Sequence, residues 1–282
     1  MEFHNSGAEI YVPDGSPVGA ALSRTTHLAV SAHQDDIEIM AYHGILECFG
    51  QPGKGFGGVT VTNGSGSPRD GLYGNYTDDE MQVVRRKEQK KAAIIGEYAA
   101  HVFLDYASSA VKDPGNVAVV EDLKRIISAA KPQVMYTHNL ADKHDTHVAT
   151  ALRVIRALRE LAGDSRPEHL YGCEVWRSLD WLNDDDKVVF NVEAHENLGM
   201  SLVGVFDSQV CGGKRYDLAT MGRRRANATY LASHGVDEST ALIFATELTP
   251  LIHDAQLDAG EYMQGFINRF AREVSDRIAR LA

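Results

Sequence analysis

Five ionisable side chains stand in two clusters that each follow an apolar run. They are His33, Asp35, Asp36, His144 and His147. Two neutral imidazoles and one carboxylate form a common catalytic zinc site, which leaves a further coordination position for water. A bound metal lowers the pKa of that water toward ~7, and a nearby carboxylate can take the proton as the water attacks. Helix capping would explain the aspartates alone, whereas both clusters together indicate a metal site.

Each cluster is expected at the carboxyl end of a β-strand. Apolar runs alternate with helical patterns four times, which is typical of a doubly wound, mostly parallel, Rossmann-like α/β sheet. The four predicted strands are 26–33, 59–62, 101–106 and 133–137. In the strand order 3-2-1-4-5, the first and fourth strands are neighbours at the switch point where ligands bind. The two clusters are therefore predicted to meet in space.

The whole chain, 1–282, is expected to form one domain, with a core at about 25–165 and a C-terminal elaboration at about 166–282. Residues 1–24 are interpreted as a lead-in. The predicted helices are 37–49, 77–99, 117–130, 146–161, 195–206, 217–233 and 260–281, and two further strands are expected at 169–177 and 187–192. The segment between 233 and 260 gives no clear pattern.

Composition narrows the class of partner. The formal net charge of -11 argues against nucleic acid and anionic membranes, and favours a small-molecule substrate. Three widely spaced cysteines predict no disulfide framework, which fits a cytoplasmic protein, and no apolar run has the length of a membrane span. The basic runs 85–91 and 223–225 are interpreted as solvated helix faces. The glycine-rich run 50–58 follows a helix and precedes a strand, so it argues against a dinucleotide fingerprint.

Residues 32–39, Ala-His-Gln-Asp-Asp-Ile-Glu-Ile, resemble the Ala-His-Pro-Asp-Asp-Glu signature of the LmbE-like, PIG-L family of zinc-dependent N-acetylglucosaminyl deacetylases. Residues 142–147, Asp-Lys-His-Asp-Thr-His, are similar to that family's second motif, Asp-x-His-Pro-Asp-His. The resemblance extends over residues 26–160. Supporting matches are the strand 59–64, the helix 85–93 and the pair Ser208-Gln209.

The resemblance implies a role for each motif residue. His33, Asp36 and His147 would bind one zinc ion, and Asp35 would act as general base. His144 would stabilise the oxyanion of the tetrahedral intermediate. The implied reaction is hydrolysis of an N-acetyl or other N-acyl amide on a small amino-sugar-like substrate.

Three departures from the family pattern stand out. Gln34 and Ile37 replace residues to which no ligand role is assigned. In the second motif Thr146 stands where the family has an aspartate that supports the oxyanion histidine, and Thr146 brings no charge. Asp142 and Asp145 are the two candidates to replace that carboxylate.

Two other functions remain open at this stage. The same metal-activated water would suit a hydratase or lyase that acts on a small unsaturated carboxylate, and a non-catalytic sugar-binding module is the third possibility. Arg69, Arg85 and Asp142 are the candidates for substrate binding, although Arg85 is also placed to pair with Glu88. Assembly into a homo-oligomer is compatible with the sequence, which does not indicate the number of copies.

Overall fold

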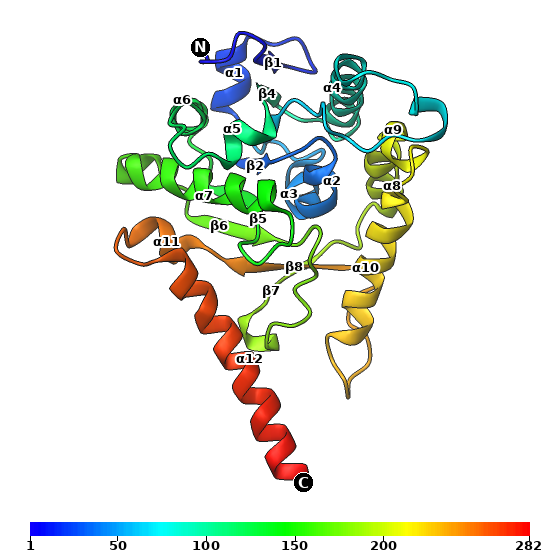
Figure 1. The fold of residues 1–282 in the computed structure, drawn as a ribbon, viewed down its shortest axis with the longest axis vertical. Coiled ribbons are helices and arrows are strands. Elements are labelled where there is room, and N and C mark those ends of the chain that lie inside the picture. Colours follow the sequence, from blue (N-terminus) through cyan, green and yellow to red (C-terminus); the bar gives the residue numbers. More distant parts are fainter.

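A computed structural model describes all 282 residues of the chain. An eight-stranded sheet runs through the molecule in the order β1-β4-β3-β2-β5-β6-β8-β7 (Figure 1). The strands are β1 (Glu9–Tyr11), β2 (His27–Ser31), β3 (Phe56–Thr62), β4 (Ala100–Tyr106), β5 (Val134–His138), β6 (His169–Cys173), β7 (Val188–Asn191) and β8 (Leu242–Glu247). The five central strands, β4 to β6 in that order, are parallel. The predicted α/β class and the order 3-2-1-4-5 of the first five predicted strands are confirmed.

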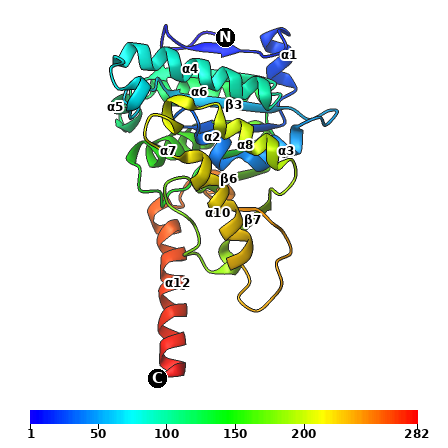
Figure 2. The ribbon, with the colours of Figure 1, turned by 90° about the vertical axis from the view of Figure 1, so that its right-hand side faces the viewer.

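Helices cover both faces of the sheet (Figures 1 and 2). They are α1 (Val18–Ser23), α2 (Asp36–Met40), α3 (Tyr42–Cys48), α4 (Asp78–Ile95), α5 (Ser108–Lys112), α6 (Ala118–Ala130), α7 (Asp145–Glu160), α8 (Glu196–Gly204), α9 (Asp207–Val210), α10 (Tyr216–Tyr230), α11 (Thr249–His253) and α12 (Ala259–Leu281). Three short 3-10 turns lie at Gly71–Tyr73, Gly163–Ser165 and Asp184–Asp186. None of these helices combines the length and the apolar character needed to cross a membrane.

Alternating side chains of the central strands separate two cores. Leu28 and Val30 of β2 pack with α6, α7 and α11, whereas Ala29 points to the other face and packs with α2, α3, α4 and α8. This alternation is the two-residue period of a strand. Because both faces are covered, the strand runs are almost wholly apolar, and the polar residues collect at the strand ends.

Pairing at the sheet edges differs from the prediction. The lead-in contains β1, which pairs antiparallel with β4, and the segment without a clear pattern contains β8, which lies antiparallel between β6 and β7. β1 has only three residues, so a local pattern gives little sign of it, whereas β8 is a largely apolar run of six residues that the sequence analysis did not identify. The predicted helix 37–49 is two helices, which break at Ala41.

Candidate active site

The turn after β2 and the segment after β5 carry the two clusters to one place. β2 and β5 pair in register, with Ala29 opposite Tyr136, so their carboxyl ends lie side by side. His33 lies in the turn after β2, and Asp36 is the first residue of α2. From the other strand, His147 lies in the first turn of α7. The fold therefore brings the two clusters together, as the sequence predicted.

Three of the predicted ligand atoms form a nearly equilateral triangle. His33 Nδ1 lies 3.1 Å from His147 Nε2 and 3.3 Å from Asp36 Oδ2, and His147 Nε2 lies 3.4 Å from the same Asp36 oxygen. Tetrahedral coordination with bonds of about 2.0–2.1 Å separates neighbouring ligand atoms by about 3.3 Å. The donor set and its spacing fit a zinc-like divalent cation. Which metal the protein uses remains a prediction.

Electrostatics favour the ligand form of the carboxylate. Burial disfavours ionisation of Asp36, but the neighbouring His147 and His138 outweigh it and hold the pKa of Asp36 well below its ordinary value. The backbone N–H of His33 also donates a hydrogen bond of 2.7 Å to Asp36 Oδ2. Asp36 is therefore an ionised carboxylate held toward the two imidazoles.

Asp142 supports the triangle from behind. Its Oδ2 lies 3.6 Å from His147 Nδ1, on the side of the ring away from Asp36, and accepts a 3.0 Å hydrogen bond from the Trp176 backbone N–H. Its Oδ1 accepts a 2.9 Å hydrogen bond from the backbone N–H of His144. A carboxylate behind a metal-binding histidine sets the ring's orientation and tautomer. This placement favours a role for Asp142 in orienting His147, and direct substrate binding by Asp142 stays a prediction.

His138 is a component of the site to which the sequence analysis gave no role. It is the last residue of β5, and its ring stacks on that of His147 with 3.9 Å between centroids. Its Nε2 lies 3.5 Å from Asp36 Oδ2, but it accepts a 2.8 Å hydrogen bond from the Ala32 backbone N–H. Because that lone pair is engaged, His138 supports the triangle and does not extend it. Its only sequence signal was its position at a strand end beside the second cluster.

Asp35 is held beside the triangle in a strained conformation. Its backbone has φ of 84°, a region that non-glycine residues rarely adopt, at a cost of about 1–3 kcal/mol that the surroundings must offset. The backbone N–H of Asp35 donates to Gln89 Oε1 at 3.2 Å, and Asp35 Oδ2 accepts a 2.8 Å hydrogen bond from Arg85. Strain of this kind gathers at functional sites.

A buried ion-pair chain extends from Asp35 into α4. Arg85 is only 1% exposed and also contacts Glu88 at 3.2 Å, while Glu88 accepts two 2.7 Å hydrogen bonds from the backbone and hydroxyl of Ser208. Burial raises the pKa of Asp35 to about 6, and the positive charge of Arg85 opposes that rise. A carboxyl with such a pKa exchanges protons near neutral pH, as a general base must.

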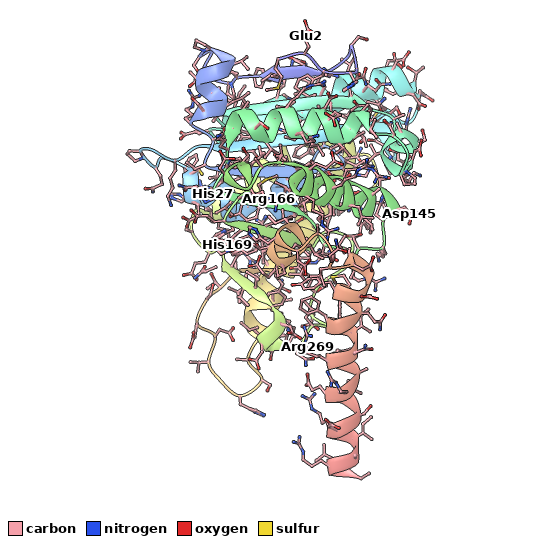
Figure 3. The ribbon with its side chains drawn as sticks, turned by 90° about the vertical axis from the view of Figure 1, so that its left-hand side faces the viewer. Glu2, His27, Asp145, Arg166, His169 and Arg269 are labelled. Atoms are coloured by element: carbon pink, nitrogen blue, oxygen red, sulfur yellow. The ribbon has the colours of Figure 1, made fainter.

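His144 lacks the carboxylate partner that the sequence analysis sought. Asp142 contacts the backbone N–H of His144 but not its ring, and Asp145 lies at the surface (Figure 3). His144 Nδ1 is buried without a hydrogen-bond partner, which leaves Nε2 to serve the cavity. Burial and the adjacent His147 and His33 lower the pKa of His144. Its ring is therefore neutral, and neither Asp142 nor Asp145 replaces the missing carboxylate.

Two adjoining hollows, of about 310 and 220 Å³, lie beside the predicted catalytic and metal-binding residues. Both are lined by Asp35, Asp36, Trp176 and Tyr216. The larger one reaches the loop at 62–68, with Lys112 and His144 on its other side, and the smaller one reaches Ile39 and the start of α10. Trp176 and Tyr216 meet edge to face, with 6.0 Å between ring centroids, and form a wall that the sequence analysis did not identify.

Arg69 braces the loop that borders the larger hollow. Its guanidinium donates to the carbonyl oxygens of Ser65 and Tyr76, each at 2.6 Å, and pairs with Asp78 at 2.7 Å. It does not line the hollow, whereas Arg85 does. Direct substrate binding by Arg69 or Arg85 stays a prediction, because both guanidinium groups already have partners within the protein.

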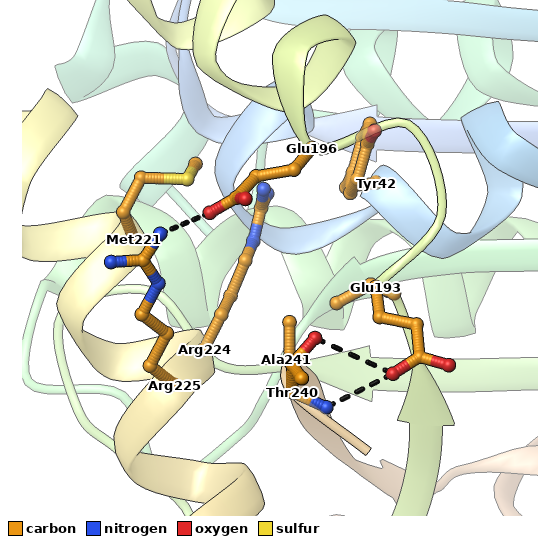
Figure 4. A pocket seen from close by; sticks show the side chains of 9 residues that line it. Tyr42, Glu193, Glu196, Met221, Arg224, Arg225, Thr240 and Ala241 are labelled. Carbon is orange, nitrogen blue, oxygen red and sulfur yellow. Dashed lines mark hydrogen bonds and ion pairs between the residues drawn. The ribbon is translucent and has the colours of Figure 1, made fainter.

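A separate cavity of about 280 Å³ lies between α8, α10 and the start of β8 (Figure 4). Its charged groups are largely engaged with one another: Glu196 pairs with Arg225, and Glu193 accepts a 3.0 Å hydrogen bond from the backbone N–H of Thr240. None of the candidate catalytic or metal-binding residues lines it. The chemistry is therefore assigned to the hollows beside His33.

The two basic runs are not simply solvated helix faces. Arg85 is buried beside Asp35, and Arg224 is buried with its guanidinium 4.5 Å above the ring of Tyr42 and a 2.8 Å hydrogen bond to the carbonyl oxygen of Glu38. That prediction was wrong for these two residues. Each occupies the inner face of its helix, where it satisfies polar groups of the segment that begins at Gln34.

The chain resembles known proteins in one part of its sequence and in its fold. A family model described as PIG-L, GlcNAc-PI de-N-acetylase, matches residues 28–158. No curated protein matches. Similar solved structures include GalB, the 4-carboxy-2-hydroxymuconate hydratase from Pseudomonas putida KT2440, with a TM-score of 0.60 and 15% identity over 79% of this chain and 96% of that one.

Two deacetylases are similarly close in fold. The N,N'-diacetylchitobiose deacetylase from Pyrococcus horikoshii has a TM-score of 0.59 and 17% identity over 77% of this chain and 82% of that one. The A40926 pseudoaglycone deacetylase Dbv21 has a TM-score of 0.58 and 17% identity over 79% of this chain and 97% of that one. At such identities these likenesses establish the fold and no more.

Proposed function

Because residues 28–158 form a domain of the PIG-L (LmbE-like) family, we propose that the chain is a metal-dependent N-deacetylase of small, sugar-like substrates. The observation that supports this most strongly is the triangle of His33, Asp36 and His147 with Asp35 beside it. The fold likeness to deacetylases of N,N'-diacetylchitobiose and of a pseudoaglycone is consistent with such substrates.

The triangle would hold the metal, with zinc as the proposed ion. The chemistry that a bound zinc ion supplies is a water molecule acidic enough to attack an amide near neutral pH. Asp35 lines the same hollow as His33 and Asp36, so its carboxylate is available to take a proton from attacking water. Arg85 and the strained backbone keep that carboxylate in place, which reduces the reorganisation needed for proton transfer.

The remaining residues complete amide hydrolysis. His144 would donate a hydrogen bond from Nε2 to the oxygen of the acyl carbonyl, where negative charge develops. Protonated Asp35 would return its proton to the leaving nitrogen, so that acetate and a free amine result. Trp176 and Tyr216 would contact the apolar face of a sugar-like ring, as aromatic side chains commonly do in small-molecule sites.

The test combines metal analysis with acetate release. Purified protein should contain about one zinc ion and should release acetate from N-acetylglucosamine or N,N'-diacetylchitobiose. Asp35→Asn should keep the metal and lose on the order of 10²–10⁴-fold in turnover, because a general base contributes that much. Asp145→Asn, a change at an exposed position within the second motif, is the matched control. Undiminished acetate release by metal-loaded Asp35→Asn would exclude Asp35 from the reaction.

A hydratase is the second candidate, because the similar folds include the hydratase GalB. The same acid and base would then serve the addition of water to a carbon-carbon double bond. Loss of the ultraviolet absorbance of muconate-type acids, without acetate release from any N-acetylated sugar, would favour it. Acetate release without hydration would favour the deacetylase.

A further inference from the structure

The helix α12 lies against the body of the protein as far as Phe270, whose ring meets Trp181 edge to face with 6.4 Å between centroids, and then projects from it (Figures 1, 2 and 3). Met263 and Phe266 are buried against Leu242 and Phe244 of β8. Arg269 then pairs with Asp186 at 2.7 Å, near the point where the helix projects. No hydrogen bond or ion pair joins residues 271–281 to any element before α12.

The projecting part keeps an apolar stripe on one side. From the buried Met263, the stripe continues through Ile267, Phe270, Val274, Ile278 and Leu281. The 19 residues from Met263 to Leu281 make about five turns, so the stripe runs straight along one face. Its outer members are exposed, Ile278 by 63% and Leu281 by 76%. Arg272 and Asp276 lie on the opposite face.

A helix as short as residues 271–281 is marginally stable in water when it has no partner. A contiguous exposed apolar stripe of this kind is typical of a contact surface. One edge of the stripe carries Glu273 and Arg277, which pair within the helix, and the other edge carries the small, uncharged Ala271 and Ser275. A partner that matches this stripe needs apolar residues at the same spacing and complementary charges along one edge only.

A second copy of α12 meets both requirements when it runs antiparallel. With the two-fold axis at Val274, Ile267 lies opposite Leu281, and the charged edges of the two copies face each other, with each Glu273 two positions, about 3 Å along the helix axis, from the level of the other copy's Arg277. In a parallel pair, the charged edge would face the uncharged edge instead. The antiparallel arrangement also directs the two bodies, each of formal net charge -11, toward opposite ends of the helix pair, where their repulsion is weakest.

We propose that the chain forms a homodimer in which α12 of one copy packs antiparallel against α12 of the other, along the stripe from Ile267 to Leu281. The dimer holds two complete sites, since every residue of the proposed site comes from one chain. This assembly is independent of the proposed reaction, and its test does not depend on activity.

The first test measures mass in solution. Light scattering on the full chain at tens of micromolar should give twice the chain mass of 30.9 kDa. Val274→Glu should yield a monomer with unchanged sheet content and metal content, because it places a charge at the two-fold axis. Arg272→Glu, on the opposite face, should remain dimeric. A monomeric parent chain, or a Val274→Glu variant that stays dimeric, would overturn the proposal.

The second test decides orientation by crosslinking. Cys211 is the exposed cysteine, so Cys211→Ser provides the background. Ile267→Cys and Leu281→Cys proteins, mixed and oxidised, should form a disulfide between the two variants, and neither variant alone should crosslink. Efficient crosslinking of each variant with itself would contradict the antiparallel pair.

Discussion

At the scale of single residues, Asp142 connects the second motif to the triangle of His33, Asp36 and His147. Its carboxylate contacts His147 Nδ1 and two backbone N–H groups, those of His144 and Trp176. Burial opposes ionisation of Asp142, yet the adjacent imidazole of His147 and the hydrogen bond from the His144 backbone N–H outweigh it and lower the pKa of the carboxyl. Asp142 is therefore ionised and orients the ring of His147.

We expect Asp142→Asn to weaken zinc binding by about 10–100-fold, the usual effect of removing a group that orients a metal-binding histidine. Competition with a chromogenic zinc chelator measures the affinity directly. Asp145→Asn is the matched control, because Asp145 lies at the surface one turn away along the same motif. If both variants bind zinc as the parent does, Asp142 does not orient His147.

At the same scale, His144 lacks a carboxylate partner because Thr146 stands where the family pattern has an aspartate. Thr146 is buried and lines the larger hollow, but it has no charge to offer an imidazole. A neutral ring donates a weaker hydrogen bond than an imidazolium. His144 would therefore act as a neutral donor here, and Asp35 is left as the only proposed residue that changes protonation during the reaction.

At the scale of elements, α4 carries the arginine and glutamate that hold Asp35, so the start of this helix matters for the site. Thr77 and Glu80 form a capping box: the Thr77 hydroxyl accepts from the Glu80 N–H, and Glu80 accepts a 2.8 Å hydrogen bond from the Thr77 N–H. These bonds satisfy two N–H groups that the helix itself leaves free.

Removal of the cap should destabilise the fold without removing activity. We expect Thr77→Ala to lower the free energy of unfolding by about 1 kcal/mol, as is usual for a lost N-cap. Urea denaturation followed by circular dichroism measures it. Thr77→Ser keeps the hydroxyl and should retain most of the stability. An equal loss in both variants would show that the threonine methyl, rather than the cap, stabilises the helix.

At the scale of the whole molecule, buried neutral histidines make stability depend on pH. Burial lowers the pKa of His101 to about 3. Its ring lies within the sheet, where Nε2 is 3.0 Å from the Thr60 hydroxyl. Near pH 6.5 the unfolded chain binds a proton at this histidine, whereas the folded chain does not. The contribution of His101 to the free energy of unfolding is therefore complete above that pH and is lost as the pH drops toward 3.

Between pH 7 and pH 5, His101 should account for a loss of about 2 kcal/mol of unfolding free energy. We expect His101→Gln, which keeps a partner for Thr60, to show a smaller difference between urea titrations at the two pH values. His234→Gln, in the exposed loop after α10, should behave as the parent does. If His101→Gln leaves the difference in unfolding free energy between pH 7 and pH 5 unchanged, groups other than His101 cause the acid sensitivity.

Much of the fold could be predicted because its signals are local. The apolar runs that became β2 to β6 and the helical patterns between them lie within short windows, and the order 3-2-1-4-5, taken from the common doubly wound topology, is the order that the structure has. That order brings His33 near His147 without knowledge of any contact. The sequence alone therefore determined the α/β class, and together with the assumed strand order it located the place where the two clusters meet.

Tertiary structure alone decided the features that depend on distant partners. Arg85 is buried because Asp35, fifty positions earlier, accepts its hydrogen bond, and His138 joins the site because its ring stacks on His147. β8 exists because β6 and β7 supply its hydrogen bonds, and the stripe of α12 is exposed because the body ends beneath it. The burial and the pairing of a residue depend on which distant residues the fold brings next to it. A local sequence pattern does not contain that information.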